Sequence, residues 1–217
     1  MNALFIVAHP DDEILGAGGT ITRLKARGDR VAVLTLSTSS KTREDGLAAL
    51  QEKINAEIGI DVTYQQDYAT MRFGEYDRFE MTQVIEDVLL KEQPDVVFTH
   101  DEHDIHNDHR VTTLIVLEAI KLPLRHRGLC KAIAGVYTME IPSSSDWGSG
   151  FVPNTFFRIE ETDIGVKAKA LEQYDDVLRP LPHPRNYESL WALARYRGGQ
   201  CGCDYAEAFR KVMEVNQ

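Results

Sequence analysis

The sequence predicts an α/β fold: a single domain over residues 1–217, built on a doubly wound, mostly parallel sheet with helices on both faces. Two observations support this prediction. Short, almost continuously apolar segments alternate with longer amphipathic segments through the first half of the chain. Glycine or proline follows several of the amphipathic segments, as is typical where helices end. Strands with no polar side indicate a sheet that helices cover on both faces.

The expected strands and helices follow one another in a regular order. In the first half we expect strands at 3–8, 31–37, 61–65 and 95–99 and helices at 14–27, 45–58, 79–92 and 108–120. In the second half we expect strands at 132–139 and 155–159 and helices at 163–176, 187–197 and 205–215. Two loops, 141–153 and 179–186, are long enough to border a binding site. In a sheet of order 3-2-1-4-5, the first and fourth strands are neighbours, and ligands bind beyond their carboxyl ends.

Composition narrows the classes of function. A chain of 217 residues with 43% hydrophobic content can form one sizeable core. A net charge of −10 argues against nucleic acid as the main partner. We expect no membrane span and no signal peptide, because no apolar run is long enough and no basic segment precedes the first strand. Three cysteines without a framework spacing indicate a reducing, cytoplasmic compartment. A homo-oligomer is one of the states that the sequence allows.

Two polar clusters directly follow the first and fourth expected strands. The first is Ala-His-Pro-Asp-Asp-Glu at residues 8–13, and the second spans residues 100–110 and holds four of the seven histidines. The predicted topology brings both clusters to one edge of the sheet. It places His9, Asp11 and Asp12 near some members of a second group, which comprises His103, His106, Asp108 and His109. So much charge in one place favours a bound cation.

The residue types in these clusters favour zinc. Two histidines and one carboxylate with an open fourth position are the usual ligands of a catalytic zinc ion, and a further carboxylate can take a proton from water. An all-carboxylate Mg²⁺ site fits less well, because imidazole prefers Zn²⁺ and related metals. Asp108 taken alone could simply cap a helix. Two converging clusters are better explained by a metal centre.

These motifs carry a resemblance to a known family. Residues 8–13 followed by Gly16-Ala17-Gly18-Gly19 resemble the signature of the PIG-L (LmbE-like) zinc-dependent N-deacetylases, and His106-Asn107-Asp108-His109-Arg110 resembles their H-x-D-H-R motif. The resemblance covers most of the chain. It implies a Rossmann-like, LmbE-like fold and a hydrolase that removes an acetyl group from an N-acetylglucosamine-type sugar or glycoconjugate, a small-molecule substrate.

The resemblance also implies roles for individual residues. One Zn²⁺ ion per chain would be held by His9, Asp12 and His109. Asp11 would be the general base that takes a proton from the attacking water. A charged His106 would stabilise the oxyanion or protonate the leaving amine, and Asp108 would orient an imidazole. Glu13 has no assigned role beyond pairing with a helix N-terminus.

Several further residues are candidates for substrate contact. Arg43 and Arg72 follow the second and third expected strands, at the same edge of the sheet as the polar clusters. His183 and Arg185 lie in a loop that three prolines stiffen. Gln51 lies near a position where many relatives carry a substrate-binding arginine. His100 is expected to be a structural or surface residue.

Three other functions are compatible with parts of the pattern. A phosphoesterase would need a second metal ion and more bridging carboxylates. A nucleotide-binding protein would explain glycines after a strand, but here they follow an acidic turn and lack the G-x-G-x-x-G spacing. A non-catalytic sugar-binding module on the same fold would have no need of Asp11.

Overall fold

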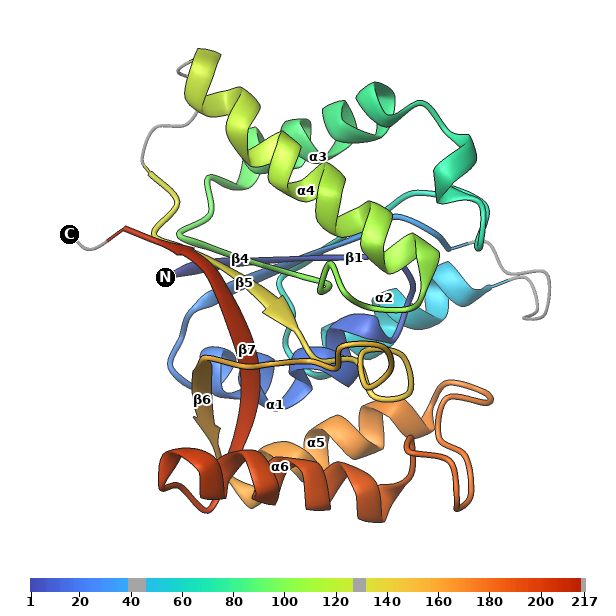
Figure 1. Ribbon diagram of the computed structural model, residues 1–217, viewed down its shortest axis with the longest axis vertical. Helices are drawn as coiled ribbons and strands as arrows, with labels where there is room; N and C mark the ends of the chain where they lie inside the picture. Colours follow the sequence, from blue (N-terminus) through green and yellow to red (C-terminus); the bar gives the residue numbers. More distant parts are fainter. Residues whose placement is uncertain (39–45, 127–131, 216–217) are drawn as a thin grey trace.

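A seven-stranded sheet of order β3-β2-β1-β4-β5-β7-β6 forms the centre of the protein (Figure 1). The computed structural model describes residues 1–38, 46–126 and 132–215, except for the side chains of 122–126. The strands are β1 (Asn2–Val7), β2 (Arg30–Thr35), β3 (Val62–Gln65), β4 (Val96–Thr99), β5 (Gly135–Met139), β6 (Thr155–Ile159) and β7 (Tyr205–Glu214). The helices are α1 (Asp12–Ala26), α2 (Leu47–Glu57), the short 3-10 helix η1 (Phe73–Glu75), α3 (Arg78–Glu92), α4 (Asn107–His126), α5 (Glu161–Glu172) and α6 (Tyr187–Cys201).

The first five strands confirm the predicted order. They pair in parallel, and β1 lies between β2 and β4, so that Leu4 is opposite both Ala32 and Val97. At the other edge, β7 pairs antiparallel with both β5 and β6. The sheet is therefore doubly wound and mostly parallel, with β1 and β4 side by side as expected.

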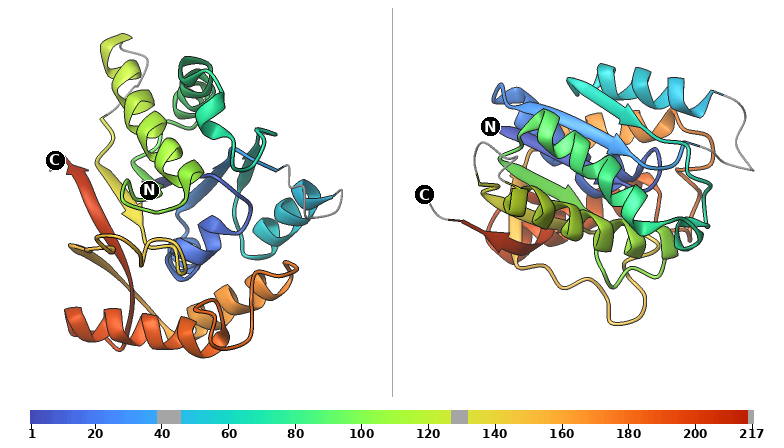
Figure 2. Two further views of the ribbon diagram at one scale, coloured as in Figure 1. Left: turned by 45° about the vertical axis from the view of Figure 1, so that its right-hand side comes forward. Right: turned by 90° about the horizontal axis from the view of Figure 1, so that it is seen from above.

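Helices cover both faces of the sheet (Figure 2). In β1, Leu4 and Ile6 pack in the core beneath α3 and α4, whereas Phe5 and Val7 pack beneath α1 on the opposite face. All four side chains are buried, which explains why β1 is apolar without alternation. α5 and α6 lie outside α1 and form a further core cluster with it. No described helix is long and apolar enough to span a bilayer.

The glycine-rich segment at the start of α1 serves helix packing. A Cβ atom at Gly16 would lie 2.9 Å from Cβ of Met139 in β5, and one at Gly19 would lie 2.8 Å from Cδ1 of Ile159 in β6. Neither position has room for a larger side chain. These glycines therefore let α1 approach the sheet closely, which accounts for them without a bound nucleotide.

The expected helix at 205–215 is wrong, because these residues form strand β7. The segment is rich in helix-forming residues, but its first five residues are buried between β5 and β6. Tertiary packing overrides helix propensity in such a position. Glu207 in this strand accepts hydrogen bonds from the backbone N–H groups of Gly19 and Thr20, just after α1 departs from helical geometry at Ala17.

Candidate metal centre

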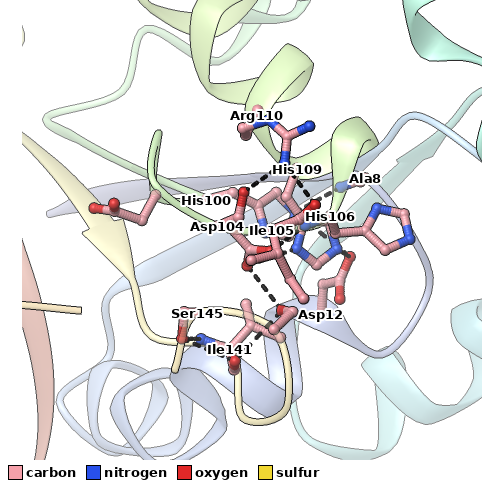
Figure 3. A network of polar contacts seen from close by, with 12 residues as sticks. Ala8, Asp12, His100, Asp104, Ile105, His106, His109, Arg110, Ile141 and Ser145 are labelled. Atoms are coloured by element: carbon pink, nitrogen blue, oxygen red, sulfur yellow. Dashed lines mark hydrogen bonds and ion pairs between the residues drawn. The ribbon is translucent and has the colours of Figure 1, made fainter. Parts of the chain in front are cut away.

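The two polar clusters meet at the carboxyl ends of β1 and β4. His9 and Asp11 lie in the turn between β1 and α1, and Asp12 is the first residue of α1. His109 lies in the first turn of α4, which follows β4. Because the two strands pair in parallel, both segments lie at the same edge of the sheet. Figure 3 shows the side chains of Asp12 and His109 gathered at this point.

One carboxylate oxygen of Asp12 contacts three imidazoles, those of His9, His100 and His109. This Oδ2 atom lies 3.3 Å from Nδ1 of His9 and 3.4 Å from Nε2 of His109. The backbone N–H of His9 also donates to this oxygen over 2.9 Å, which fixes the carboxylate within the turn. Asp12 and His109 are buried, and His9 is half-buried. Imidazoles and a carboxylate are the protein ligands of a catalytic zinc site with an open position. Here the potential ligands form two overlapping groups, His9 with His106 and His109, and Asp12 with His100 and His109.

A second carboxylate holds each of the two imidazoles on its far side. Nδ1 of His109 lies 2.9 Å from Oδ2 of Asp104, and Nε2 of His9 lies 3.1 Å from Oδ2 of Asp108. Metal-binding histidines usually donate their second N–H to a carboxylate, because this bond sets the tautomer and the orientation of the ring. Asp108 thus contacts an imidazole, that of His9. The contact of Asp104 was not foreseen, since a loop carries no pattern that reports such a pairing.

One nitrogen of His109 has no hydrogen-bond partner. With Nδ1 against Asp104, the Nε2 atom is buried and makes no hydrogen bond among the described residues, and its contact with Asp12 is 3.4 Å long. Nδ1 of His100 and Nδ1 of His106 are also buried without a hydrogen bond among these residues. A buried polar atom without a partner is costly, and a metal ion at this point would satisfy it. The donor set of two imidazole nitrogens and one carboxylate oxygen favours zinc and related transition metals over Mg²⁺. The residues present therefore fit a zinc ion.

The electrostatics of the cluster also favour a cation. Burial alone would raise the pKa of Asp12, but the imidazoles of His109 and His100 hold it well below its ordinary value. Burial alone would lower the pKa of His9, but hydrogen bonds to Asp108 and Asp12 raise it to about 9. Without a metal, His9 therefore carries a proton near neutral pH. A metal ion that binds to His9 must displace this proton.

His100 is a buried structural residue of the centre. Its ring stacks on that of His109, with centroids 3.9 Å apart and planes 14° apart. Its Nε2 atom lies 3.4 Å from Oδ2 of Asp12, but it accepts a hydrogen bond from the backbone N–H of Ala8 and is not free to bind a metal. Burial and the neighbouring His109 keep the pKa of His100 well below its ordinary value. The neutral ring therefore supports His109 from the side.

His106 lies beside both proposed ligand histidines. Its ring centroid is 4.5 Å from that of His109 and 4.9 Å from that of His9. Burial and the two neighbouring imidazoles lower its pKa to about 4. His106 is therefore neutral near pH 7, in contrast to the charged form expected from the sequence. The reason is that a site with several buried imidazoles disfavours one more positive charge.

Asp11 occupies a strained backbone position. Its φ angle of 102° lies in the left-handed region, which few residues other than glycine adopt. Its carbonyl accepts a hydrogen bond from the N–H of Leu15 over 2.8 Å, and its own N–H donates to Oε2 of Glu13 over 3.2 Å. Such strain persists only where the surroundings hold it, and it is common in active sites. The turn therefore holds Asp11 in one conformation directly before Asp12.

Glu13 connects this turn to α2. Its Oε1 atom accepts a hydrogen bond of 2.8 Å from Nε2 of Gln51, which also donates to Oγ1 of Thr35. Glu13 and Gln51 are completely buried, so Gln51 does not present its amide to a substrate. Burial raises the pKa of Glu13 to about 7, and the bond from Gln51 offsets this only in part. Glu13 therefore supports the backbone of the Asp11 turn.

The structure describes only one of the two arginines that were predicted to contact the substrate. Arg43 lies outside the described residues. Arg72 is exposed and forms an ion pair with Glu75. The backbone N–H groups on either side of Arg72, those of Met71 and Phe73, donate to the Asp108 carboxylate. The segment around Arg72 thus borders the metal centre, while the guanidinium bonds to a surface carboxylate.

The loop that carries His183 and Arg185 packs against the loop that follows β5. Nε of Arg185 donates to the carbonyl of Pro142 and to Oγ of Ser143 over 3.0 and 2.9 Å. The N–H of Arg185 donates to Nδ1 of His183. The two predicted loops therefore lie side by side, and the side chain of Arg185 forms hydrogen bonds between them.

Comparison with known proteins identifies the family of the chain. Residues 4–120, which contain both polar clusters, match the family described as PIG-L: GlcNAc-PI de-N-acetylase. The chain belongs to the PIG-L family. A curated relative of this PIG-L chain is the diacetylchitobiose deacetylase of Thermococcus kodakarensis. It is 30% identical over 230 residues, a match that covers 96% of the chain and 82% of the relative.

Solved structures share the fold of this PIG-L protein. The conserved protein TT1542 of Thermus thermophilus matches with a TM-score of 0.81 at 24% identity, covering 99% of this chain and 96% of that one. GalB, the 4-carboxy-2-hydroxymuconate hydratase of Pseudomonas putida KT2440, matches with a TM-score of 0.77 at 20% identity, covering 100% of this chain and 98% of that one. Because the fold also carries a hydratase, the activity must be argued from the site.

Proposed function

We propose that the protein is a zinc-dependent N-deacetylase that removes the acetyl group from an N-acetylglucosamine-type sugar or glycoconjugate. The observation that carries the proposal is the environment of His109. Its Nδ1 atom is held by Asp104, and its buried Nε2 atom makes no hydrogen bond among the described residues but lies 3.4 Å from the carboxylate of Asp12. The curated relative is named a deacetylase, and the family description names GlcNAc, which supports the reaction and the substrate class.

One zinc ion would be held by His9, Asp12 and His109. A bound zinc ion supplies polarisation of the amide carbonyl and lowers the pKa of water toward about 7. A single ion fits the inventory of carboxylates, because Asp104 and Asp108 already hold the imidazoles and are not free to bridge a second ion. This inventory favours an amide hydrolase over a two-metal phosphoesterase.

Asp11 would act as the general base. It would take a proton from the water that attacks the acetyl carbonyl, and this proton would pass to the amine nitrogen as the C–N bond breaks. The strained turn around Asp11 is consistent with a side chain that must be held in one position. Asp11 would therefore serve first as a base and then as an acid.

His106 would stabilise the oxyanion of the tetrahedral adduct as a neutral hydrogen-bond donor. With a pKa of about 4, its imidazole is a poor source of a proton near neutral pH. A cation held by His9 and His109 would favour the same neutral form, because positive charges repel. The transfer of the proton to the amine is therefore assigned to Asp11 rather than to His106.

Release of free amine tests the proposal directly. The zinc-loaded protein is incubated with N-acetylglucosamine, N,N′-diacetylchitobiose and N-acetylglucosaminides with varied aglycones, and primary amine and acetate are measured. We expect both products in equal amounts, loss of activity with a chelator, and recovery with one equivalent of zinc.

The same assay separates the competing functions. Two zinc ions per chain together with hydrolysis of an aryl phosphate would favour the phosphoesterase. Sugar binding without release of amine from any substrate would favour the non-catalytic module and contradict the proposal.

A further inference from the structure

A short turn after β5 contacts the metal centre from outside the predicted motifs. Residues 141–145 close on themselves, because the N–H groups of Ser144 and Ser145 both donate to the carbonyl of Ile141. Both serines are buried, with 6% and 3% of their surface exposed. Figure 3 shows Ile141 and Ser145 next to the metal centre. The turn is thus a compact unit with two buried hydroxyl groups.

The two hydroxyls differ in their shortest hydrogen bonds. Oγ of Ser145 accepts from the N–H of Ile141 and donates to its carbonyl, over 2.9 and 2.8 Å, so that it serves its own turn. Oγ of Ser144 donates to Oδ2 of Asp104 over 2.8 Å and makes only a longer contact, of 3.4 Å, with the carbonyl of Ile141. The carbonyl of Ser144 also accepts a hydrogen bond from the N–H of Ile105. Ser144 is therefore attached to the segment that precedes α4 by its side chain and by its backbone.

Asp104 connects Ser144 to His109. Its Oδ2 atom accepts both the Ser144 hydroxyl and Nδ1 of His109, and its Oδ1 atom accepts the N–H of His106 over 2.7 Å. A carboxylate that accepts three hydrogen bonds is held against rotation. Without the hydroxyl of Ser144, the oxygen that orients His109 would lose one of its two donors.

We propose that Ser144 is a positioning residue of the metal centre: its hydroxyl fixes Asp104 and thereby the orientation of His109. The inference rests on the proposed function, because it takes His109 to be a metal ligand. Removal of a group that holds a metal ligand in place usually lowers metal affinity or activity about 10- to 100-fold. Because Ser144 acts through Asp104, we expect the loss of its hydroxyl to weaken zinc binding about five- to tenfold.

A comparison of two neighbouring serines tests this role. Zinc affinity is measured for the wild-type protein, Ser144→Ala and Ser145→Ala by competition with a chromophoric chelator. We expect Ser144→Ala to bind zinc about five- to tenfold more weakly and Ser145→Ala to bind like the wild type, although both variants lose a buried hydroxyl. The Co²⁺-loaded proteins give a second readout, because a tilted imidazole changes the visible spectrum for Ser144→Ala alone.

Three results would overturn the inference, and none of them is confused with a failure of the proposed function. Wild-type affinity and an unchanged Co²⁺ spectrum in Ser144→Ala would remove the role of the hydroxyl. An equal loss in Ser145→Ala would point to the turn as a whole. Weakened binding in Ser144→Thr, which retains the hydroxyl, would do the same. Ser144→Gly replaces Ser144→Ala if that variant does not fold. Only a wild-type protein that binds no zinc would count against the metal centre itself.

Discussion

Nδ1 of His109 lies 2.9 Å from Oδ2 of Asp104, and this contact turns the opposite nitrogen of the ring toward Asp12. The contact between His9 and Asp108 does the same for the other imidazole. Because the two carboxylates orient the rings before any ion is present, the centre is preorganised. We therefore expect Asp104 and Asp108 to act mainly on metal affinity.

Asp104→Asn should weaken zinc binding about 10- to 100-fold, because an amide holds the His109 N–H less strongly than a carboxylate does. The measurement is competition with a chelator of known affinity, and catalysis at saturating zinc should be affected less. Asp101→Asn is a matched control, since Asp101 is also buried but bonds to Thr138 and Arg210 instead of an imidazole. An equal loss of affinity in both variants would contradict an orienting role for Asp104.

Asp11→Asn should reduce the release of amine by about 10²- to 10⁴-fold, because the amide cannot take a proton from water. Zinc content, measured by atomic absorption, should stay at one ion per chain, since Asp11 is not proposed as a ligand. Asp12→Asn provides the contrast, because it removes a proposed ligand and should lower zinc content as well. Turnover that persists in fully loaded Asp11→Asn would exclude Asp11 as the base.

Zinc affinity should increase with pH between about 7 and 9, because the proton on His9 competes with the ion. Burial opposes this proton, but hydrogen bonds to Asp108 and Asp12 raise the pKa of His9 to about 9. Each unit of pH below that value should therefore cost at least about tenfold in affinity, because burial opposes a proton on His109 but Asp12 and Asp104 raise its pKa, so that this proton competes as well. The dependence should weaken above a pH of about 9. Calorimetry in buffers of different ionisation enthalpy should detect at least one proton released per zinc ion at pH 7. Affinity that is independent of pH in this range would show that His9 is already neutral.

Much of the centre could be predicted from the sequence because its residues sit at positions that topology constrains. His9 and Asp12 follow the continuously apolar strand β1, and His109 lies in the first turn of α4, the helix that follows β4. A parallel sheet brings such positions together whatever the details of packing. The partners that orient these residues were harder to foresee, since Asp104 and Ser144 lie in irregular segments whose contacts depend on the complete fold.

Strand β7, which lies between β5 and β6, could not be predicted from its local sequence. Residues 205–214 contain alanine, glutamate, lysine and methionine, which favour a helix locally. They form β7 because they can pair with β5 on one side and with β6 on the other. In addition, the Glu207 side chain accepts hydrogen bonds from backbone N–H groups of α1. None of these three partners is adjacent in sequence, so a local pattern could not report them. Tertiary contacts decide the conformation there.

Glu207→Ala should lower the free energy of unfolding by about 3–5 kcal/mol, because it leaves a buried cation without its partner. Oε1 of Glu207 lies 2.7 Å from Nζ of Lys167, which is also buried, and the Glu207 carboxylate accepts the N–H groups of Gly19 and Thr20. Urea unfolding of the metal-free protein measures the change without a contribution from zinc binding.

Glu214→Ala is the control for this prediction, since it removes a carboxylate from the same strand. Glu214 pairs with Lys211 at the surface, where water replaces the lost contact, so the free energy of unfolding should not change. If Glu207→Ala were as stable as Glu214→Ala, the freed amides of α1 and the Lys167 ammonium must be satisfied by water. In that case the burial of Glu207 would not explain why a helix-favouring segment is held in the sheet as β7.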